Sequence, residues 1–417
     1  MFREKAVELG KKVKTAFNEI KIYDTRMKNS AILKIAEMLD KNRENILKAN
    51  SLDVQNSRNT GTRESLIDRL RLDDARIDGM IESCRIIAKL PDPIGQEISS
   101  RKREDGLLIR KIRVPLGPLG IIYESRPNVT VDTAVLALKA GNTVLLKGGS
   151  DAFETNSELV KIIRGALLET GFPEDCVVLV PFKEREAVEP ILHLKDELVL
   201  LIPRGGKGLI DYVRKNATVP VLETGTGNCH IFVDKSAKTD ESVNVIINAK
   251  TQKPGACNAV EKVLVHEEIA RDFLPFLIST LRKSGVRVKG CRKTIEIVEV
   301  EEAFEEDWET EYLDFILAVK TVSGLEEAVN HINRYSSGHS EAILTNDLKN
   351  AEEFCSRIDS AALYVNASTR FTDGGEFGFG AEMGISTQRL FARGPVGLEE
   401  LTTYKYVIQG YYHIRKG

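Results

Sequence analysis

The pattern of apolar and polar positions changes its period after Pro93. Before this point, apolar residues recur at helical spacing. Ile32, Ile35, Ala36 and Leu39, for example, stand at i, i+3, i+4 and i+7 with charged residues between them. The first hundred residues are therefore predicted to be mainly helical.

Two β-like segments follow this break, at residues 107–114 and 119–123, with a turn containing proline and glycine between them. Basic residues alternate with apolar ones in the first segment, so one face of this ribbon is expected to meet solvent or another subunit. Residues 404–408 and 411–414 are predicted to form strands near the C-terminus, as an added edge of a sheet.

Residues 129–234 alternate between helical segments and short, almost wholly apolar segments, and a second α/β stretch begins at residue 242. Such alternation is typical of parallel sheets whose two faces are covered by helices. The predicted fold class is therefore α/β, with parallel sheets. The strands expected in the first stretch are residues 143–146, 177–180, 198–202 and 219–222, with a helix over 184–194.

Composition excludes several classes of function. The chain has 417 residues and a formal net charge of −3, and this balance without a basic run argues against nucleic acid as a partner. No apolar run approaches the roughly 20 residues that span a bilayer, and no signal peptide is visible at the start. We therefore expect a soluble, cytoplasmic protein with no membrane contact. No cluster of histidines or acids has metal-binding spacing, so we predict no metal.

Cys257 stands apart from the other cysteines. Six cysteines occur, none in a C-x-x-C pair, and the default for each is a small buried hydrophobe. Cys257 instead follows Pro254-Gly255 on a polar turn between a predicted helix and a predicted strand, where Lys250 and Lys253 could stabilise a thiolate. It is the candidate nucleophile, and no histidine that would activate it in a hydrolase is evident.

Polar loops follow predicted strands of the first parallel sheet, where such sheets bind ligands. The first loop, Lys147-Gly148-Gly149-Ser150, could hold a ribose or phosphate. The second loop, Arg204-Gly205-Gly206, precedes a helix, and its amides could face a pyrophosphate or a nicotinamide. Neither loop is the G-x-G-x-x-G fingerprint. Glu223, at a third strand end, is a general base or a plain capping acid.

A lysine after a parallel strand, a glutamate at a strand end and a loop cysteine occur in the order Lys147, Glu223, Cys257, which resembles the aldehyde dehydrogenase superfamily. Longer motifs make the resemblance narrower. They resemble the γ-glutamyl phosphate reductase family over essentially the whole chain, and they include Tyr123-Glu-Ser-Arg-Pro-Asn128, Asn248-Ala-Lys-Thr-Gln252, Gly338-His-Ser-Glu-Ala342, Val365-Asn-Ala-Ser-Thr-Arg-Phe371 and Ala392-Arg-Gly-Pro-Val-Gly-Leu398.

The resemblance implies an NADP-dependent glutamate-5-semialdehyde dehydrogenase, acting in the second step of proline synthesis. In that family a cysteine thiolate, here Cys257, attacks the acyl phosphate of L-glutamyl 5-phosphate. Phosphate leaves, and NADPH reduces the thioester to L-glutamate 5-semialdehyde. Asn128 is then expected to stabilise the oxyanion together with the N–H of Cys257. Glu223 stands where oxidising relatives activate water, so its role here is catalytic or structural.

The same resemblance implies that the Lys147 and Arg204 loops bind NADP(H) and that Glu311 holds the nicotinamide ribose. Many NAD-dependent relatives carry an acid at the position of Ser150. A carboxylate would repel a 2′-phosphate and a serine would not, so we expect NADP preference. The α-carboxylate of the substrate needs a cation or an amide nest; the cationic candidates are Arg126, Arg370 and Arg393, among which the sequence does not choose.

The implied architecture is that of aldehyde dehydrogenases, with two Rossmann-like domains and a small β oligomerisation element. Residues 1–98 and 127–225 would form the cofactor-binding domain, 226–388 the catalytic domain, and 99–126 with 389–417 the oligomerisation element. A homodimer or homotetramer is expected, and a glutamate 5-kinase could hand over the labile acyl phosphate. The alternatives are a CoA-acylating or hydrolytic aldehyde dehydrogenase, a cysteine acyl-hydrolase and a non-catalytic scaffold.

Overall fold

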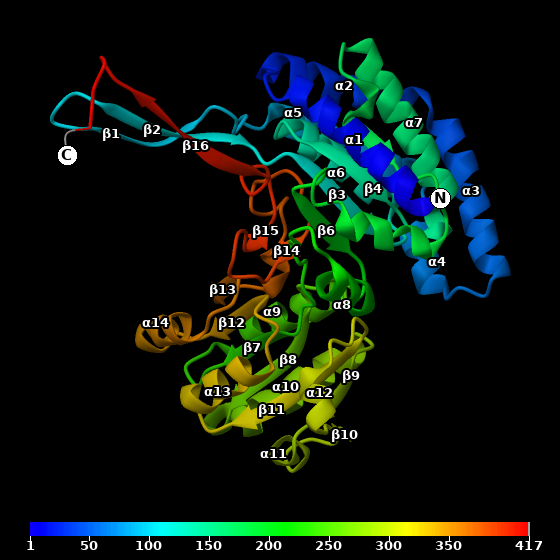
Figure 1. Ribbon diagram of the computed structural model, residues 1–417. Coiled ribbons are helices and arrows are strands. Elements are labelled where there is room, and N and C mark those ends of the chain that lie inside the picture. Colours follow the sequence, from blue (N-terminus) through cyan, green and yellow to red (C-terminus); the bar gives the residue numbers. More distant parts are fainter. Residues whose placement is uncertain (416–417) are drawn as a thin grey trace. The chain divides into compact units, whose positions relative to one another are not determined.

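The computed structural model describes residues 1–415, apart from the side chains of Ser65 and Leu66 (Figure 1). The chain divides into two compact units, each built around its own parallel sheet. Unit 1 comprises Met1–Glu223, Gly378–Gly384 and the C-terminal segment from Val396, and unit 2 comprises Thr224–Phe377 and Ile385–Pro395.

The N-terminal part of unit 1 is helical, as the apolar spacing predicts. Asp24 and Asp73 cap two of these helices. Each side chain accepts a hydrogen bond of 2.8 Å from the backbone amide three residues further on. Ile32 and Ile35 of the predicted stripe are fully buried. The helices are α1 (Phe2–Ile20), α2 (Thr25–Lys41), α3 (Arg43–Asn59), α4 (Glu64–Leu70) and α5 (Asp74–Lys89).

The parallel sheet of unit 1 has the strand order β5-β4-β3-β6. Its strands are short and almost entirely buried, because helices cover the sheet and leave apolar side chains no contact with water. The strands are β3 (Pro118–Tyr123), β4 (Thr143–Lys147), β5 (Val177–Leu179) and β6 (Leu200–Arg204), and the longer helices between them are α6 (Pro127–Lys139) and α7 (Phe153–Glu169), with α8 (Lys207–Asn216) after β6.

A separate antiparallel sheet of unit 1 joins segments far apart in the sequence. β2 (Leu108–Pro115) pairs with β1 (Glu97–Lys102) on one side and with β16 (Thr402–Gln409) on the other (Figure 1). The predicted ribbon of residues 107–114 with 119–123 is wrong, because β3 pairs in parallel with β4 and β6 instead. The wholly apolar β3 needs cover on both faces, whereas the mixed β2 does not.

Three local predictions in unit 1 also fail. Residues 411–414 do not form a strand, and the segment 219–222 contributes only an isolated bridge between Val221 and Leu201. The helix expected over 184–194 is a pair of 3₁₀ turns, Arg185–Ala187 and Glu189–His193, and the second contains a proline that cannot donate to a helical ladder.

Unit 2 contains a larger parallel sheet with the order β10-β9-β11-β8-β7-β12-β13. The strands are β7 (Cys229–Val233), β8 (Val260–His266), β9 (Arg287–Gly290), β10 (Glu301–Glu302), β11 (Ile316–Val322), β12 (Ser340–Leu344) and β13 (Ala362–Val365). The helices are α9 (Thr239–Thr251), α10 (Glu267–Lys283), α11 (Arg292–Ile295), α12 (Glu305–Glu309), α13 (Leu325–Tyr335) and α14 (Leu348–Arg357). A bridge of two short strands, β14 (Ile385–Ser386) and β15 (Gly394–Pro395), completes the unit.

The cores of unit 2 lie on either side of this sheet. One cluster joins α9 and α10 to β7, β8 and β11, and the other joins α13 and α14 to the opposite side chains of the same strands. The central strands β7 and β8 are buried along their whole length, which makes them a rigid base for the loops at their ends. No helix within residues 1–415 is long and apolar enough to cross a membrane.

Candidate active site

Cys257 lies on the turn between α9 and β8, as predicted, and its side chain is half-buried. We call residues 252–258 the cysteine loop. Its position is set by a backbone contact with Gly227, because a Cβ placed on Gly227 would lie 1.4 Å from the carbonyl oxygen of Cys257. No residue other than glycine fits there. Cys229 donates its thiol hydrogen to the same carbonyl oxygen, with Sγ 3.2 Å away.

Asn258 anchors the other end of the cysteine loop. Its side-chain amide donates to the carbonyl oxygens of Arg370, at 3.3 Å, and Thr372, at 2.8 Å. Its own carbonyl accepts a hydrogen bond of 2.7 Å from the hydroxyl of Thr369. The segment around the 3₁₀ turn Thr369–Phe371 is therefore tied directly to the residue after Cys257.

A buried ionic network lies at the two flanks of the cysteine loop. Lys250, in the last turn of α9, and Glu261, on β8, are fully buried, with Nζ 2.9 Å from Oε2. The ammonium of Lys250 is thus bonded to Glu261, which corrects its suggested role as a thiolate counter-ion. Burial raises the pKa of Glu261 to about 6, and burial lowers the pKa of the neighbouring Lys262 to about 8.

The same network holds the segment that carries Glu311. Glu261 accepts a hydrogen bond from the Leu313 amide at 3.2 Å, and Lys262 donates to the Thr310 carbonyl at 2.7 Å. Glu311 itself accepts the N–H of Gly227 through Oε1, at 2.7 Å. Burial raises the pKa of Glu311, and the Gly227 hydrogen bond opposes that rise. Glu311 and Cys257 were separate predictions, and both contact Gly227.

The Lys147 loop of unit 1 lies at the carboxyl end of β4. Lys147 is 4% exposed, donates to the Gly148 carbonyl at 3.0 Å, and has its pKa lowered by burial. A Cβ on Gly148 would lie 2.3 Å from Nδ2 of Asn156, so the backbone here approaches a buried side chain closely. Ser150 begins a 3₁₀ turn and is exposed.

The Arg204 loop lies at the end of β6 and leads into α8. Gly205 and Gly206 are exposed, and the Gly206 amide donates to Oε2 of Glu124 at 3.0 Å. A Cβ on Gly205 would lie 2.6 Å from the carboxyl carbon of Glu124. One of the amides expected to face a ligand is therefore capped by a carboxylate of the chain itself.

Asn128 is exposed on the first turn of α6. Its Nδ2 donates to Asp132, one turn further on, at 3.0 Å, and Ser83 donates to the other carboxylate oxygen of Asp132 at 3.1 Å. Burial raises the pKa of Asp132, and the Asn128 hydrogen bond opposes that rise. Asp132 thereby orients the amide of Asn128.

The remaining predicted residues differ in how they are held. Glu223 is half-buried and Arg126 is exposed, immediately before α6. Arg393 forms an ion pair of 2.5 Å with Asp359, and Arg370 donates from Nε to Gln252 at 2.7 Å. Unit 2 thus brings together Cys257, Glu311 and Arg370, while unit 1 carries the cofactor-loop candidates and Asn128.

Sequence reasoning missed three residues that shape these loops: Gly227, Asn258 and Glu124. Asn258 directly follows Cys257 and Gly227 lies four residues after Glu223, but only their contacts across the fold reveal their roles. Glu124 belongs to the motif quoted for the resemblance, and its position beside α8 explains why an acid stands there.

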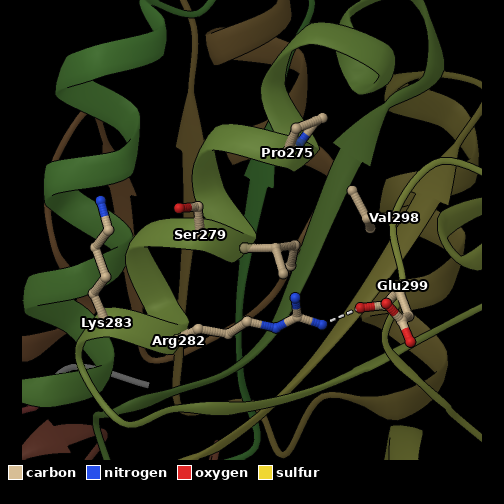
Figure 2. Close-up of a pocket in the computed structure, with 7 residues that line it drawn as sticks. Pro275, Ser279, Arg282, Lys283, Val298 and Glu299 are labelled. Atoms are coloured by element: carbon tan, nitrogen blue, oxygen red, sulfur yellow. Dashed lines mark hydrogen bonds between the residues drawn. The ribbon is translucent and has the colours of Figure 1, made fainter.

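A surface hollow on unit 2 lies elsewhere. Figure 2 shows it between α10 and the segment of Val298 and Glu299, with Arg282 donating to the carbonyl oxygen of Glu299. It contains none of the predicted site residues. Among residues 1–415, no group of histidine, cysteine and acidic side chains is arranged to hold a metal ion.

The model of the aldehyde dehydrogenase family matches residues 3–294 and 305–407. The chain therefore belongs to the aldehyde dehydrogenase family, and the predicted resemblance and α/β fold class are confirmed. Membership of this family implies a nicotinamide cofactor and a small-molecule substrate.

Comparisons with individual proteins are more informative than the family model. γ-Glutamyl phosphate reductase of Thermotoga maritima is 59% identical over 414 residues, covering 99% of this chain and 100% of that protein. The enzyme of the same name from Kosmotoga olearia is 54% identical over 413 residues, with the same coverage of both chains. A crystal structure of the Thermotoga maritima enzyme superimposes with a TM-score of 0.97, covering 99% of this chain and 100% of that one.

A more distant solved structure shares only the fold. It is an acetylating aldehyde dehydrogenase from Geobacillus thermoglucosidasius, 18% identical, with a TM-score of 0.71 and coverage of 100% of this chain and 98% of that one.

Proposed function

We propose that the protein reduces L-glutamyl 5-phosphate to L-glutamate 5-semialdehyde and phosphate, with NADPH as reductant, in the second step of proline biosynthesis. The observation that carries the proposal is the 59% identity to γ-glutamyl phosphate reductase along the whole chain. The half-buried Cys257, on a turn positioned from both ends, is consistent with a nucleophile.

In the proposed reaction, Sγ of Cys257 bonds to the γ-carbonyl carbon, the C–O bond to phosphate breaks, and a thioester forms. The negative charge on the carbonyl oxygen would be met by the Asn128 amide and the N–H of Cys257. Asp132 keeps one amide hydrogen of Asn128 occupied and so orients the other. When bound, NADPH supplies the hydride that converts the thioester to the aldehyde and returns Cys257 as a thiolate.

The residues of both units fit a nicotinamide cofactor. In unit 1, Lys147 is the last residue of β4, Ser150 begins the 3₁₀ turn that follows, and Gly205 and Gly206 precede α8, where a phosphate would have to displace the Glu124 carboxylate from the Gly206 amide. In unit 2, Glu311 keeps Oε2 for a ribose hydroxyl while Oε1 binds Gly227. We propose NADP preference because Ser150 has no charge to repel a 2′-phosphate.

We propose a structural role for Glu223, since a reductase gains nothing from activating water. The substitution Glu223→Gln should then leave the reduction rate within about threefold of wild type. If the wild type hydrolyses the thioester at a substantial rate and Glu223→Gln does not, the result would instead favour a hydrolytic aldehyde dehydrogenase.

The deciding assay measures NADP⁺ reduction with L-glutamate 5-semialdehyde, with and without phosphate. The proposal predicts activity that depends on phosphate and disappears in Cys257→Ala, while the control Cys355→Ala, in α14, remains active. Activity in which CoA or water replaces phosphate would identify the alternative dehydrogenases. Equal kcat/KM for NADH and NADPH would contradict the proposed NADP preference.

We also propose that the antiparallel sheet of unit 1 mediates homo-oligomerisation. Tyr404, Tyr406 and Ile408 on β16 are 48%, 58% and 60% exposed, an unusual concentration of large apolar side chains on one strand. Tyr406→Glu should convert the proposed dimer or tetramer to a smaller species in light scattering. Hand-off of the acyl phosphate from a glutamate 5-kinase, and a cytoplasmic location, complete the proposal.

A further inference from the structure

The strongest unassigned feature near Cys257 is the arginine on the segment that anchors the cysteine loop. Arg370 touches that loop at both ends. Its carbonyl accepts the amide of Asn258, the residue after Cys257, at 3.3 Å. Its guanidinium donates from Nε to the side chain of Gln252, five residues before Cys257, at 2.7 Å. A cation is therefore held against the loop that carries the nucleophile.

The backbone of Arg370 is rigidly placed. Ser368 accepts the Arg370 amide hydrogen at 3.3 Å, and Thr369, the first residue of the turn, and Thr372, directly after it, are fully buried. The hydroxyl of Thr369 bonds to the Asn258 carbonyl at 2.7 Å. The fixed backbone together with the hydrogen bond from Nε to Gln252 holds the guanidinium in place, which reduces the entropy lost when its Nη groups bind a ligand.

The charge of Arg370 is not neutralised within the part of unit 2 that the structure describes. Its bonded partner there is the neutral amide of Gln252, whereas Arg393, the other arginine candidate in this unit, is paired with the carboxylate of Asp359. Arg389 pairs with the same carboxylate. Arg370 is half-buried as a residue, its bond to Gln252 is exposed, and the fork of Nη1 and Nη2 is the group that best matches a carboxylate.

We propose that Arg370 binds the α-carboxylate of the substrate through Nη1 and Nη2, with Gln252 fixing the orientation of the guanidinium. This inference rests on the proposed function, in which the γ-carbonyl carbon of the substrate meets Cys257. The α-carboxylate is four carbon–carbon bonds from that carbon, and Arg370 is anchored on the residue that follows the nucleophile. Arg370 is then the residue that selects a carboxylated aldehyde over a plain one.

The test compares three aldehydes in the phosphate-dependent reduction of NADP⁺. L-Glutamate 5-semialdehyde carries both the carboxylate and the ammonium, glutarate semialdehyde carries the carboxylate alone, and pentanal carries neither. Truncating one partner of a charged hydrogen-bonded pair typically costs a factor of roughly 30 to 1,000 in binding. Arg370→Ala should raise KM for both carboxylated aldehydes by that factor and leave kcat/KM for pentanal within about twofold.

Two further variants keep the test decisive. Arg370→Lys retains the charge but loses the fork, and should give an intermediate KM. The matched control Arg357→Ala removes a surface arginine of α14 that pairs with Glu326 and Glu353, and should leave all three aldehydes unchanged. The alkylation rate of Cys257 by iodoacetamide, which has no carboxylate, reports whether the cysteine loop is intact in each variant.

The outcomes are distinguishable. An unchanged KM for the carboxylated aldehydes in Arg370→Ala, or an equal loss with pentanal and slower alkylation, overturns the inference. A rise in KM with Arg126→Ala in place of Arg370→Ala overturns it as well. If the wild type fails to reduce NADP⁺ with L-glutamate 5-semialdehyde and phosphate, the proposed function itself is wrong.

Discussion

Glu341 provides a sharp test of how burial controls charge in unit 2. It lies on β12, between β7 and β13 of the sheet, opposite His230 of β7, and is completely buried. One carboxyl oxygen accepts the His230 amide at 2.7 Å, and the other is bonded to the hydroxyl of Ser336. Nδ1 of His230 lies 3.3 Å from Oε2, no ion pair with a lysine or arginine is formed among residues 1–415, and burial raises the pKa of Glu341 to about 8.

The expected effect follows from proton linkage. The folded state holds a proton on Glu341 up to about pH 8, whereas the unfolded chain releases it near pH 4.5. A raised pKa means that this contribution to stability is full below pH 4.5 and is lost as the pH rises towards 8. The pKa values of the folded and unfolded states differ by about 8 − 4.5 = 3.5. At about 1.4 kcal/mol per pH unit, the free energy of unfolding falls by up to about 5 kcal/mol across this range.

The perturbation is Glu341→Gln, which keeps a neutral side chain of the same shape. Its carbonyl can accept the His230 amide, and its NH₂ can donate to Ser336. Because glutamine does not titrate, the free energy of unfolding of the variant minus that of wild type should rise by about 1.4 kcal/mol per pH unit between pH 5 and 8. Taking this difference removes the contributions of groups that both proteins share.

Urea unfolding followed by tryptophan fluorescence measures the difference. Trp308 is the single tryptophan of the chain and belongs to unit 2, so its signal reports this unit. Glu352→Gln, an exposed substitution on α14, is the matched control and should give a difference independent of pH. Parallel stability curves for wild type and Glu341→Gln would refute the reasoning, because they would mean that Glu341 ionises at its ordinary pH.

Two further predictions concern the cysteine loop. Gly227→Ala places a Cβ where the Cys257 carbonyl oxygen lies, so the loop must shift and kcat should fall by about 10²-fold. The control Gly79→Ala, in an open helical position, should not change kcat. An active Gly227→Ala enzyme would contradict the contact. Lys250→Met leaves the buried carboxylate of Glu261 without its partner and should lower the free energy of unfolding by about 3–5 kcal/mol in urea titrations. Little change on that substitution would show that Glu261 is neutral in the folded protein.

Local pattern was sufficient for much of the fold. The helical stripe at Ile32 and Ile35 and the apolar runs that became β4 and β6 were predicted because side-chain period and burial are properties of neighbouring residues. The same reasoning failed for β3, which it joined to β2, since strand partners are chosen by the whole sheet. It also failed at residues 184–194, where compact 3₁₀ turns replace a helix.

For the candidate site, local sequence was enough to identify the residue types that carry chemistry. Cys257 on a turn after Pro-Gly and Lys147 at a strand end are local features, and the motifs around them led to the correct family. The surroundings of these residues depend on the folded chain. Gly227 lies 30 residues before Cys257 in the chain and 84 before Glu311, yet it contacts both. Arg370 and Gln252 are likewise far apart in the sequence and bonded in the structure. Such contacts depend on how distant segments pack, and the spacing of residues along the chain does not record which segments will meet.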